Sequence, residues 1–291
     1  MEMLTTLLLA LLQDAGEVSI GSDRIAVRLH AKNGQRGPAT MSFAAPKRGE
    51  GILVAFARDR HAHFYHWSKS GGGRRVFDVA FITSDGEIAE VLPLLSEELG
   101  HPDPPHGISA VKGVTSEQEI RFALFLPPNS AGRSGVKKGV KAAVDLKGVE
   151  AEELPAMELG DKRIYLEIVA HEPDRSRGLT YRPALSKGDG MIFAYPDAKR
   201  RPFWMYRTFV SIDVSYLSAD GTLLEINPMK RLSNPEDERA ARGSMVPTKV
   251  EGIYVLETPL GWLQESGYKV GDKFALPKAL TESKPEKSPF E

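Results

Sequence analysis

The chain has 291 residues, which predicts two domains on a prior of about 150 residues per domain. Hydrophobic residues make up 41% and charged residues 26% of it, as is typical of soluble globular proteins. The formal net charge is −1, so the basic excess typical of a nucleic-acid-binding domain is lacking and no nucleic-acid partner is expected. The sequence has no cysteine, which excludes disulfides, cysteine nucleophiles, thiolate zinc sites and iron–sulfur clusters.

Residues 1–21 are predicted to be a signal peptide or another N-terminal segment. The apolar run at residues 4–12 has the length of a signal-peptide core, and it is too short to span a bilayer, which takes about 20 apolar residues. Glu2 is acidic and Arg24 is the first basic residue, so the positive region that should precede such a core is lacking. We expect export to the periplasm or the extracellular space, with a mature chain that begins near residue 16 or 17. The alternative is a cytoplasmic protein whose N-terminal helix is disordered or docked.

Residues 22–146 are predicted to form a first domain made mainly of β-strands. Short runs rich in β-branched and aromatic residues, bounded by turn-forming residues, are typical of strands. The Asp-Gly pair at residues 85–86 is typical of a tight hairpin turn, because glycine tolerates a positive φ. The strands expected in this domain cover residues 24–30, 52–56, 76–83, 87–92 and 120–126.

An acidic and polar stretch, residues 147–160, is predicted to link this domain to a second one at residues 161–277. The polar tail at residues 278–291 is expected to be disordered. One helix is expected to begin after Asn234 as its N-cap, and another is expected to end before Gly267. The strands expected in the second domain cover residues 164–169, 191–195, 210–216, 222–227 and 252–258.

The two predicted domains are similar to each other in sequence. An offset of 139 residues aligns Gly51 with Gly190, and after an insertion in the first domain an offset of 135 aligns Asp78 with Asp213. The matches keep their order over more than a hundred residues, which indicates a duplication. We therefore expect a mainly β fold of two tandem homologous β-sandwich or jelly-roll-like barrel domains with a few short helices.

The second copy carries seven short motifs in a fixed order. They are "RSRGLTYR" (175–182), "GDGMIFAY" (188–195), "FWMYRT" (203–208), "IDVSYLSADG" (212–221), "YVLE" (254–257), "GW" (261–262) and "KVGDK" (269–273). On these motifs the second copy resembles the domain of unknown function 192 family, and the first copy resembles it only through the second. The resemblance implies a compact β-sandwich or jelly-roll-like barrel with a small helix, and it implies no activity.

Four side chains of these motifs are predicted to contact a ligand. They are Arg175, Trp204, Asp213 and Glu257. Phe203, Trp204 and Tyr206 are expected on one strand, with successive rings on opposite faces. Such rings usually fill or cover a core, and the functional alternative for Trp204 is a stacking wall for a sugar.

Asp213 alternates with Ser211 and Ser215 on the face of its strand that is expected to meet solvent. Its recurrence as Asp78 favours a structural pair, with Arg175 as the partner in the second copy, over a ligand contact. A third interpretation is acid–base chemistry, which Asp213 and Glu257 could perform if their carboxyl groups lay about 5–9 Å apart.

Metal and nucleotide sites are not expected, and no cofactor is predicted. The run "RHAHFYHW" places His61 and His63 on one face of a strand and His66 on the other, whereas zinc needs three or four converging ligands. His101 or His106 could complete a set, but no spacing requires it. The glycine-rich run at residues 131–139 lacks the spacing of a phosphate-binding loop.

The sequence favours a non-catalytic binding or scaffold protein of the cell envelope, whose second domain holds a saccharide or another small polar molecule. The alternatives are a hydrolase of a saccharide or small polar ester that uses Asp213 and Glu257, and a purely structural module that binds a protein partner. The first copy is expected to keep only the scaffold, because Phe125 stands at the Glu257 position and Tyr65 at the Trp204 position. A pocket formed by the four predicted side chains would favour ligand binding over a structural role.

Overall fold

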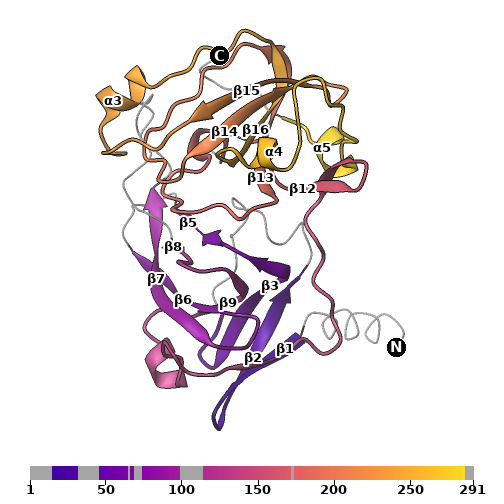
Figure 1. The fold of residues 1–291 in the computed structure, drawn as a ribbon. Coiled ribbons are helices and arrows are strands. Elements are labelled where there is room, and N and C mark those ends of the chain that lie inside the picture. The colour runs from indigo at the N-terminus through magenta and orange to yellow at the C-terminus, as the bar shows by residue number, and fades with distance from the viewer. Residues whose placement is uncertain are drawn as a thin grey trace. The chain divides into compact units, whose positions relative to one another are not determined.

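The structure is a computed structural model that describes residues 15–31, 46–64, 66–68, 74–98, 114–171 and 174–285. The chain divides into two compact units, Met1–Glu153 and Leu154–Glu291, which we call unit 1 and unit 2 (Figure 1). Each unit is built on a curled β-sheet, so the mainly β fold class predicted from the sequence is confirmed. The helices in the described ranges are short: η2 Ala131–Ser134, α2 Asp174–Arg177, α3 Glu238–Gly243, α4 Trp262–Glu265 and α5 Lys278–Thr281.

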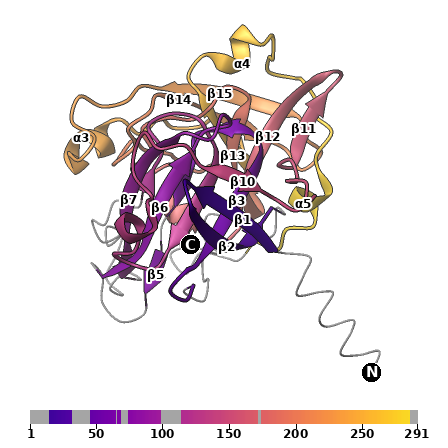
Figure 2. The ribbon, with the colours of Figure 1, turned by 90° about the horizontal axis from the view of Figure 1, so that it is seen from below.

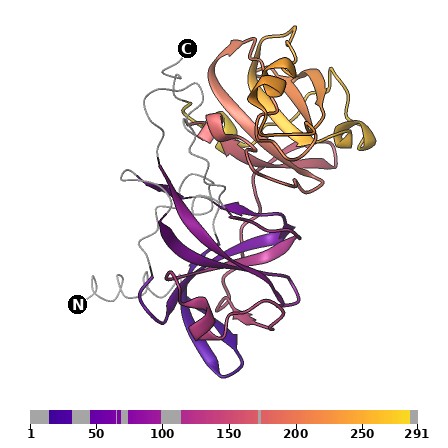
Figure 3. The same ribbon diagram turned by 90° about the vertical axis from the view of Figure 1, so that its left-hand side faces the viewer.

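The sheet of unit 1 has the strand order β10-β1-β2-β3-β9-β6-β7-β5. Strands β10, β1 and β2 lie side by side (Figure 2), and the curl of the sheet is visible in Figure 3. Neighbouring strands are antiparallel except for the parallel pairs β2–β3 and β5–β7. The bounds are β1 Ala15–Ile20, β2 Asp23–His30, β3 Glu50–Arg60, β5 His66–Ser68, β6 Arg75–Ile82, β7 Ile88–Glu98, β9 Ile120–Leu126 and β10 Ala143–Asp145, with β4 His63–Phe64 and β8 Val114–Thr115 paired separately.

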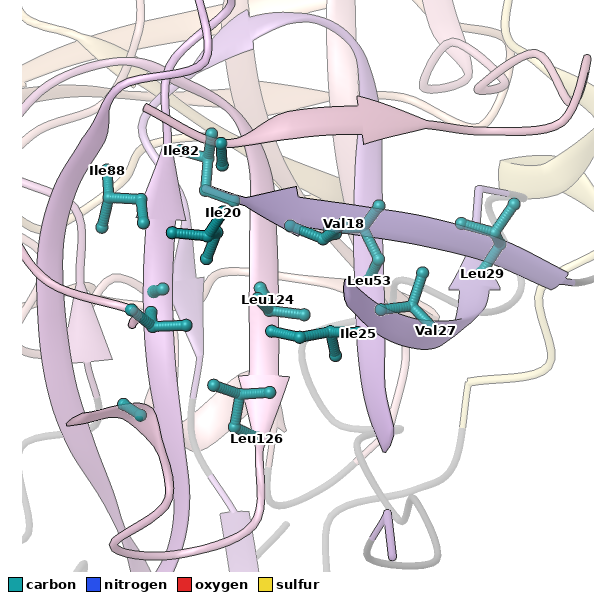
Figure 4. Close-up of a cluster of buried hydrophobic side chains, with 14 residues drawn as sticks. Val18, Ile20, Ile25, Val27, Leu29, Leu53, Ile82, Ile88, Leu124 and Leu126 are labelled. Atoms are coloured by element: carbon teal, nitrogen blue, oxygen red, sulfur yellow. The ribbon is translucent and has the colours of Figure 1, made fainter. Parts of the chain in front are cut away.

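Apolar side chains cover both faces of this sheet. Because successive residues of a strand point to opposite faces, the side chains of the run Ile52-Leu53-Val54 pack alternately into two cores. Leu53 joins one core with aliphatic side chains of the neighbouring strands (Figure 4). Ile52 and Val54 join the other core, which is rich in aromatic rings: Phe56, Phe64, Phe77, Phe81 and Phe125. Strands buried on both faces explain why the apolar runs in this half of the sequence are nearly continuous.

The sheet of unit 2 has the strand order β11-β12-β13-β16-β14-β15 (Figure 1). Only β12 and β13 run parallel, and both faces again carry a buried apolar cluster. We call the face that carries Met191, Phe193 and Val214 the pocket face and the one that carries Ile192 and Leu256 the α4 face. The bounds are β11 Ala156–Leu159, β12 Lys162–Val169, β13 Asp189–Lys199, β14 Ile212–Leu217, β15 Leu223–Met229 and β16 Gly252–Pro259.

The two units share strand order and pairing register. The series β1-β2-β3-β9-β6-β7 in unit 1 corresponds to β11-β12-β13-β16-β14-β15 in unit 2. Gly51 pairs with Val27 as Gly190 pairs with Leu166, and each glycine leaves room for a leucine that a Cβ atom would approach to 2.9 and 2.7 Å, respectively. Gly51 and Gly190, which the sequence aligns, therefore occupy the same position in their two sheets.

Several element boundaries differ from the sequence-based expectation. Strand β1 lies ahead of the expected domain start at residue 22 and pairs with β2 and β10, and β11 lies inside the expected linker and pairs with β12. The helix expected after Asn234 begins later, at α3, because Asp237 is its N-cap and accepts a hydrogen bond from the Ala240 N–H at 3.0 Å. Asn234 instead accepts from the Glu236 N–H, as in an Asx turn. Among the described helices, none is long and apolar enough to cross a membrane.

Candidate functional site

A pocket of about 300 Å³ lies on the pocket face of unit 2. Four parts of unit 2 form it: α2 with the turn that follows it, the middle of β13, the loop at residues 201–208, and β16. Three of the four predicted ligand contacts, Arg175, Trp204 and Glu257, line this pocket, whereas Asp213 does not. The structure therefore brings three of the four residues together in one pocket and places the fourth elsewhere in the unit, and their contact with a ligand stays a prediction.

Glu257 forms the floor of the pocket from strand β16. It lies opposite Met191 in β13 and Val214 in β14, which are both buried, so its side chain projects from the pocket face. Only 6% of the residue is exposed, and its Oε2 atom has no hydrogen-bond partner among the described residues. Burial raises the pKa of this carboxyl to about 8, although the nearby charge of Arg182 lowers it. Glu257 is therefore mostly protonated at pH 7 and can donate a hydrogen bond into the pocket.

Arg182 forms its ion pair with Glu167 rather than with Glu257. Its Nη1 and Nη2 atoms donate to the two carboxylate oxygens of Glu167 in β12, at 2.9 and 2.7 Å, in a bidentate pair that is almost fully buried. The guanidinium is thus oriented toward Glu167, which explains why its attraction does not offset the desolvation of Glu257.

Two arginines of the pocket stack on one tyrosine. The guanidinium carbons of Arg175 and Arg201 lie 5.0 and 4.0 Å from the centre of the Tyr195 ring. Arg175 also donates to the carbonyl of Ala194 at 3.1 Å, and Arg201 donates to the carboxylate of Asp197 at 2.5 Å. Both arginines are more than nine-tenths buried, so these contacts hold two cations in fixed positions beside the pocket.

The aromatic residues at 203–206 lie in a loop, and the expectation that they share a strand is wrong. Pro202 precedes them and a turn at Tyr206-Arg207 follows, so the extended run is too short for a strand. Phe203 packs edge-on against Phe193 at 5.3 Å between ring centres and belongs to the core. Trp204 is half-buried and lies 5.2 Å from the Tyr206 ring, so this pair forms an aromatic wall of the pocket.

Asp213 lies on the α4 face of the sheet. In β14 it pairs with Thr258, whereas its neighbour Val214 pairs with Glu257, so the two carboxyl groups project from opposite faces. Asp213 is 1% exposed, and the expected solvent-facing position is wrong because β14 lies between β16 and β15 with cores on both sides.

The partner of Asp213 is a backbone amide rather than Arg175. Its Oδ2 atom accepts a hydrogen bond from the Gly261 N–H at 2.8 Å, just ahead of α4. Asp78 likewise accepts from backbone N–H groups in unit 1, those of Asn129 at 3.0 Å and Ala131 at 2.9 Å, and it also accepts from Nε of Arg75 at 2.8 Å. Asn129 and Gly261 both have a positive φ, 62° and 76°. The recurring aspartate therefore fastens the loop that follows the same strand in each unit.

Sequence reasoning missed several residues of the pocket. Tyr195, Arg177 and Thr180 lie inside the motifs "GDGMIFAY" and "RSRGLTYR", so those motifs contained the signal although no single residue stood out. Arg201 lies between two motifs in a run of basic residues that is also typical of an exposed loop. Arg201 is held beside the pocket by its stacking on Tyr195. This contact joins a loop to strand β13, so it cannot be predicted from the neighbouring sequence.

The equivalent position in unit 1 is filled with aromatic rings. Phe125 pairs with Ile52 as Glu257 pairs with Met191, and it is fully buried. The Phe64 ring meets it edge-on at 5.0 Å between ring centres. Tyr65 and Arg36, the expected counterparts of Trp204 and Arg175, lie outside the described residues, as do His101 and His106.

The described histidines do not gather into a metal site. His63 and the hydroxyl of Thr115 are 2.5 Å apart, and the Nδ1 atom of His61 lies 3.3 Å from the carbonyl of Ser116. In the part of the chain that the structure describes, no group of three or more histidine or acidic side chains could hold a metal ion.

Comparison with known protein families identifies the domain in unit 2. The model of the DUF192 family (domain of unknown function 192), described as "Uncharacterized ACR", matches residues 156–276. The resemblance predicted for the second copy is therefore confirmed. Membership of the first copy in the same family stays a prediction.

Solved structures and curated proteins add little to this assignment. A candidate transcription regulator from Sinorhizobium meliloti 1021 is 22% identical, with a TM-score of 0.35, over 43% of this chain and 92% of its own. A protein of unknown function from Novosphingobium aromaticivorans DSM 12444 is 25% identical, with a TM-score of 0.36, over 44% of this chain and 89% of its own. A search of curated proteins finds no match.

Proposed function

We propose that this chain is a non-catalytic binding protein whose unit 2 holds a saccharide or another small polar molecule in the pocket above Glu257. The observation that carries the proposal is the buried Oε2 atom of Glu257, which lines the pocket and has no hydrogen-bond partner among the described residues. A buried polar atom without a partner costs about 1–3 kcal/mol of stability, so such atoms need an explanation. A ligand that accepts or donates a hydrogen bond at this atom supplies one.

The rest of the pocket suits a small polar ligand with one apolar face. Trp204 and Tyr206 offer ring surfaces against which the face of a sugar can stack, and the hydroxyls of Thr180 and Thr208 line the same space. A few polar groups among aromatic walls are the usual composition of small-molecule pockets. The aromatic filling around Phe125 at the equivalent position of unit 1 supports a single site, in unit 2.

Binding is favoured over hydrolysis because, among the described residues, no second carboxyl group lines the pocket, and Glu167, on the same face, is held by Arg182. Hydrolysis of a glycoside by the common mechanisms uses two carboxyl groups on either side of one bond. Asp213, the other candidate, projects from the opposite face of the sheet and is engaged by the Gly261 N–H. One protonated carboxyl can bind and orient a ligand without breaking a bond.

A location in the cell envelope is part of the proposal. The apolar run at residues 4–12 supports it, and that run lies outside the described residues. Strand β1 begins at Ala15 and pairs with both β2 and β10, so a mature chain that starts near residue 16 keeps the first sheet nearly whole.

The proposal is tested by titrating the full chain with a panel of saccharides in an isothermal calorimeter. We expect at least one to bind, and we expect Trp204→Ala to weaken that binding about 10-fold or more, equivalent to about 1.4 kcal/mol. Trp262→Ala is the matched control, because this tryptophan packs on the α4 face against Tyr268. Failure of every saccharide to bind, or equal weakening by both variants, would contradict the proposal.

A further inference from the structure

The charges of the pocket are unequal. Three arginines, Arg175, Arg177 and Arg201, line it together with one carboxyl group, that of Glu257, in the part of the chain that the structure describes. All three arginines are more than nine-tenths buried. Burying a cation is costly unless an anion or strong hydrogen bonds compensate it. Asp197 partly compensates Arg201, and an anionic ligand group in the pocket would be attracted by the arginines that line it.

The guanidinium groups are also held in place before any ligand binds. Arg175 is fixed by the carbonyl of Ala194 and the ring of Tyr195, and Arg201 by the same ring and by Asp197. A guanidinium carries five N–H donors in a planar fork that suits a carboxylate or a phosphate, and Arg201 already uses part of its fork on Asp197 and on the carbonyl of Gly252. Fixed donors lose little conformational entropy on binding, so they favour recognition of such a group.

Glu257 does not oppose an anion while it is protonated. Its surroundings favour the neutral form, because burial outweighs the attraction of Arg182, which is itself paired with Glu167. Among the described residues, the titratable groups that line the pocket with it are the three arginines, Tyr195 and Tyr206. Tyr216 is also near, and burial, Glu225 and Glu257 raise its pKa. A neutral carboxyl can donate its proton in a hydrogen bond to a ligand oxygen.

We propose that the ligand is an anionic monosaccharide, which places its carboxylate or phosphate against the arginines and its ring against Trp204. This inference rests on the proposed function, because it names the ligand class of the same pocket. The pocket volume of about 300 Å³ is at the lower end of the range for small-molecule sites, which suits one sugar unit rather than a chain. The threonine hydroxyls of the lining can bond to ring hydroxyls of the same sugar.

The test compares matched ligands on the full chain by isothermal calorimetry at pH 6.5. Sodium D-glucuronate and D-glucose 6-phosphate carry the two anionic groups, D-glucose carries none, and acetate and inorganic phosphate carry the charge without the ring. We expect one of the two anionic sugars to bind at least about 10-fold tighter than glucose and than its own free anion. Which of the two binds tighter identifies the anionic group.

Two arginine variants test whether the preference for an anionic sugar over glucose comes from the pocket. Arg175→Gln should reduce the preference for the anionic sugar over glucose about 10-fold or more, because the variant removes one guanidinium. Arg163→Gln is the control, since Arg163 lies in β12 and pairs with Glu158 at 2.8 Å outside the pocket. If Arg175→Gln fails to fold, the comparison of ligands on the unmodified chain still decides.

The outcomes separate the two proposals. Binding of glucose as tight as that of both anionic sugars would overturn the ligand class and leave the saccharide-binding function intact. Binding of acetate or phosphate as tight as that of the matching sugar would overturn the recognition of the ring. Failure of every sugar, charged or neutral, would overturn both.

Discussion

Replacing Glu257 with glutamine should remove a pH dependence of stability that this side chain imposes on unit 2. The pKa of the folded carboxyl is about 8 against an ordinary value of 4.5, so the folded chain holds a proton that the unfolded chain releases between these values. Each pKa unit corresponds to about 1.36 kcal/mol, which gives about 5 kcal/mol over this window. The free energy of unfolding should therefore fall as the pH rises from about 4.5 to about 8 and should level off above that.

The measurement is guanidinium denaturation of the natural chain and of Glu257→Gln at pH 5 and pH 9, followed by tryptophan fluorescence. Trp204 and Trp262 lie in unit 2 and Trp67 lies in unit 1, so both proteins also carry Trp67→Phe and the signal then follows unit 2. Glutamine mimics the neutral acid and does not titrate, so the variant should gain up to about 5 kcal/mol relative to the natural chain between the two pH values.

Glu225→Gln is the matched control for this experiment. Glu225 lies in β15, and its pKa is lowered because it accepts hydrogen bonds from the Thr248 hydroxyl and the Lys249 N–H, although its partial burial acts in the opposite direction. A carboxyl whose pKa is lowered on folding stabilises the folded state at every pH above its unfolded pKa, here 4.5. Glu225→Gln should therefore lower the free energy of unfolding at both pH 5 and pH 9, and it should not raise it at pH 9. If the difference between Glu257→Gln and the natural chain were the same at pH 5 and pH 9, the buried neutral carboxyl would be refuted.

Three further predictions concern the scaffold and the N-terminus. Asp213→Ala should lower the free energy of unfolding by about 1–3 kcal/mol, since the Gly261 N–H loses its acceptor; thermal melts that match the natural chain would contradict this. Gly190→Ala should cost about 1–3 kcal/mol in the same assay, because its Cβ would lie 2.7 Å from the Leu256 side chain. N-terminal sequencing of the protein from its native cells should find a start near residue 16, and an intact Met1 in a cytoplasmic fraction would exclude export.

Much of the β framework could be predicted from the sequence. The strands around Gly51 and Gly190 stood out because apolar runs bounded by turns recur at a constant offset, and such a pattern survives only where the same sheet is built twice. Strands β1 and β11 were missed because they are short and lie at the ends of segments whose overall composition is typical of leaders and linkers.

The site was less accessible to sequence reasoning. Alternation placed Asp213 on a polar face, but it cannot reveal that a second core covers that face. The change from Glu257 in one unit to Phe125 in the other was a readable signal, because a charge replaced by a large apolar ring marks a position whose role differs. The stacking of Arg175 and Arg201 on Tyr195 joins three separate segments, and sequence spacing does not encode such a contact.

The most direct test of the binding proposal is a crystal structure of the full chain soaked with the tightest-binding sugar of the titrations. The proposal predicts density for the ligand in the pocket of unit 2, with a ligand oxygen about 2.6–3.2 Å from Oε2 of Glu257 and the sugar ring against Trp204. Density beside Phe125 in unit 1, or beside Asp213 on the α4 face with the pocket empty, would contradict it.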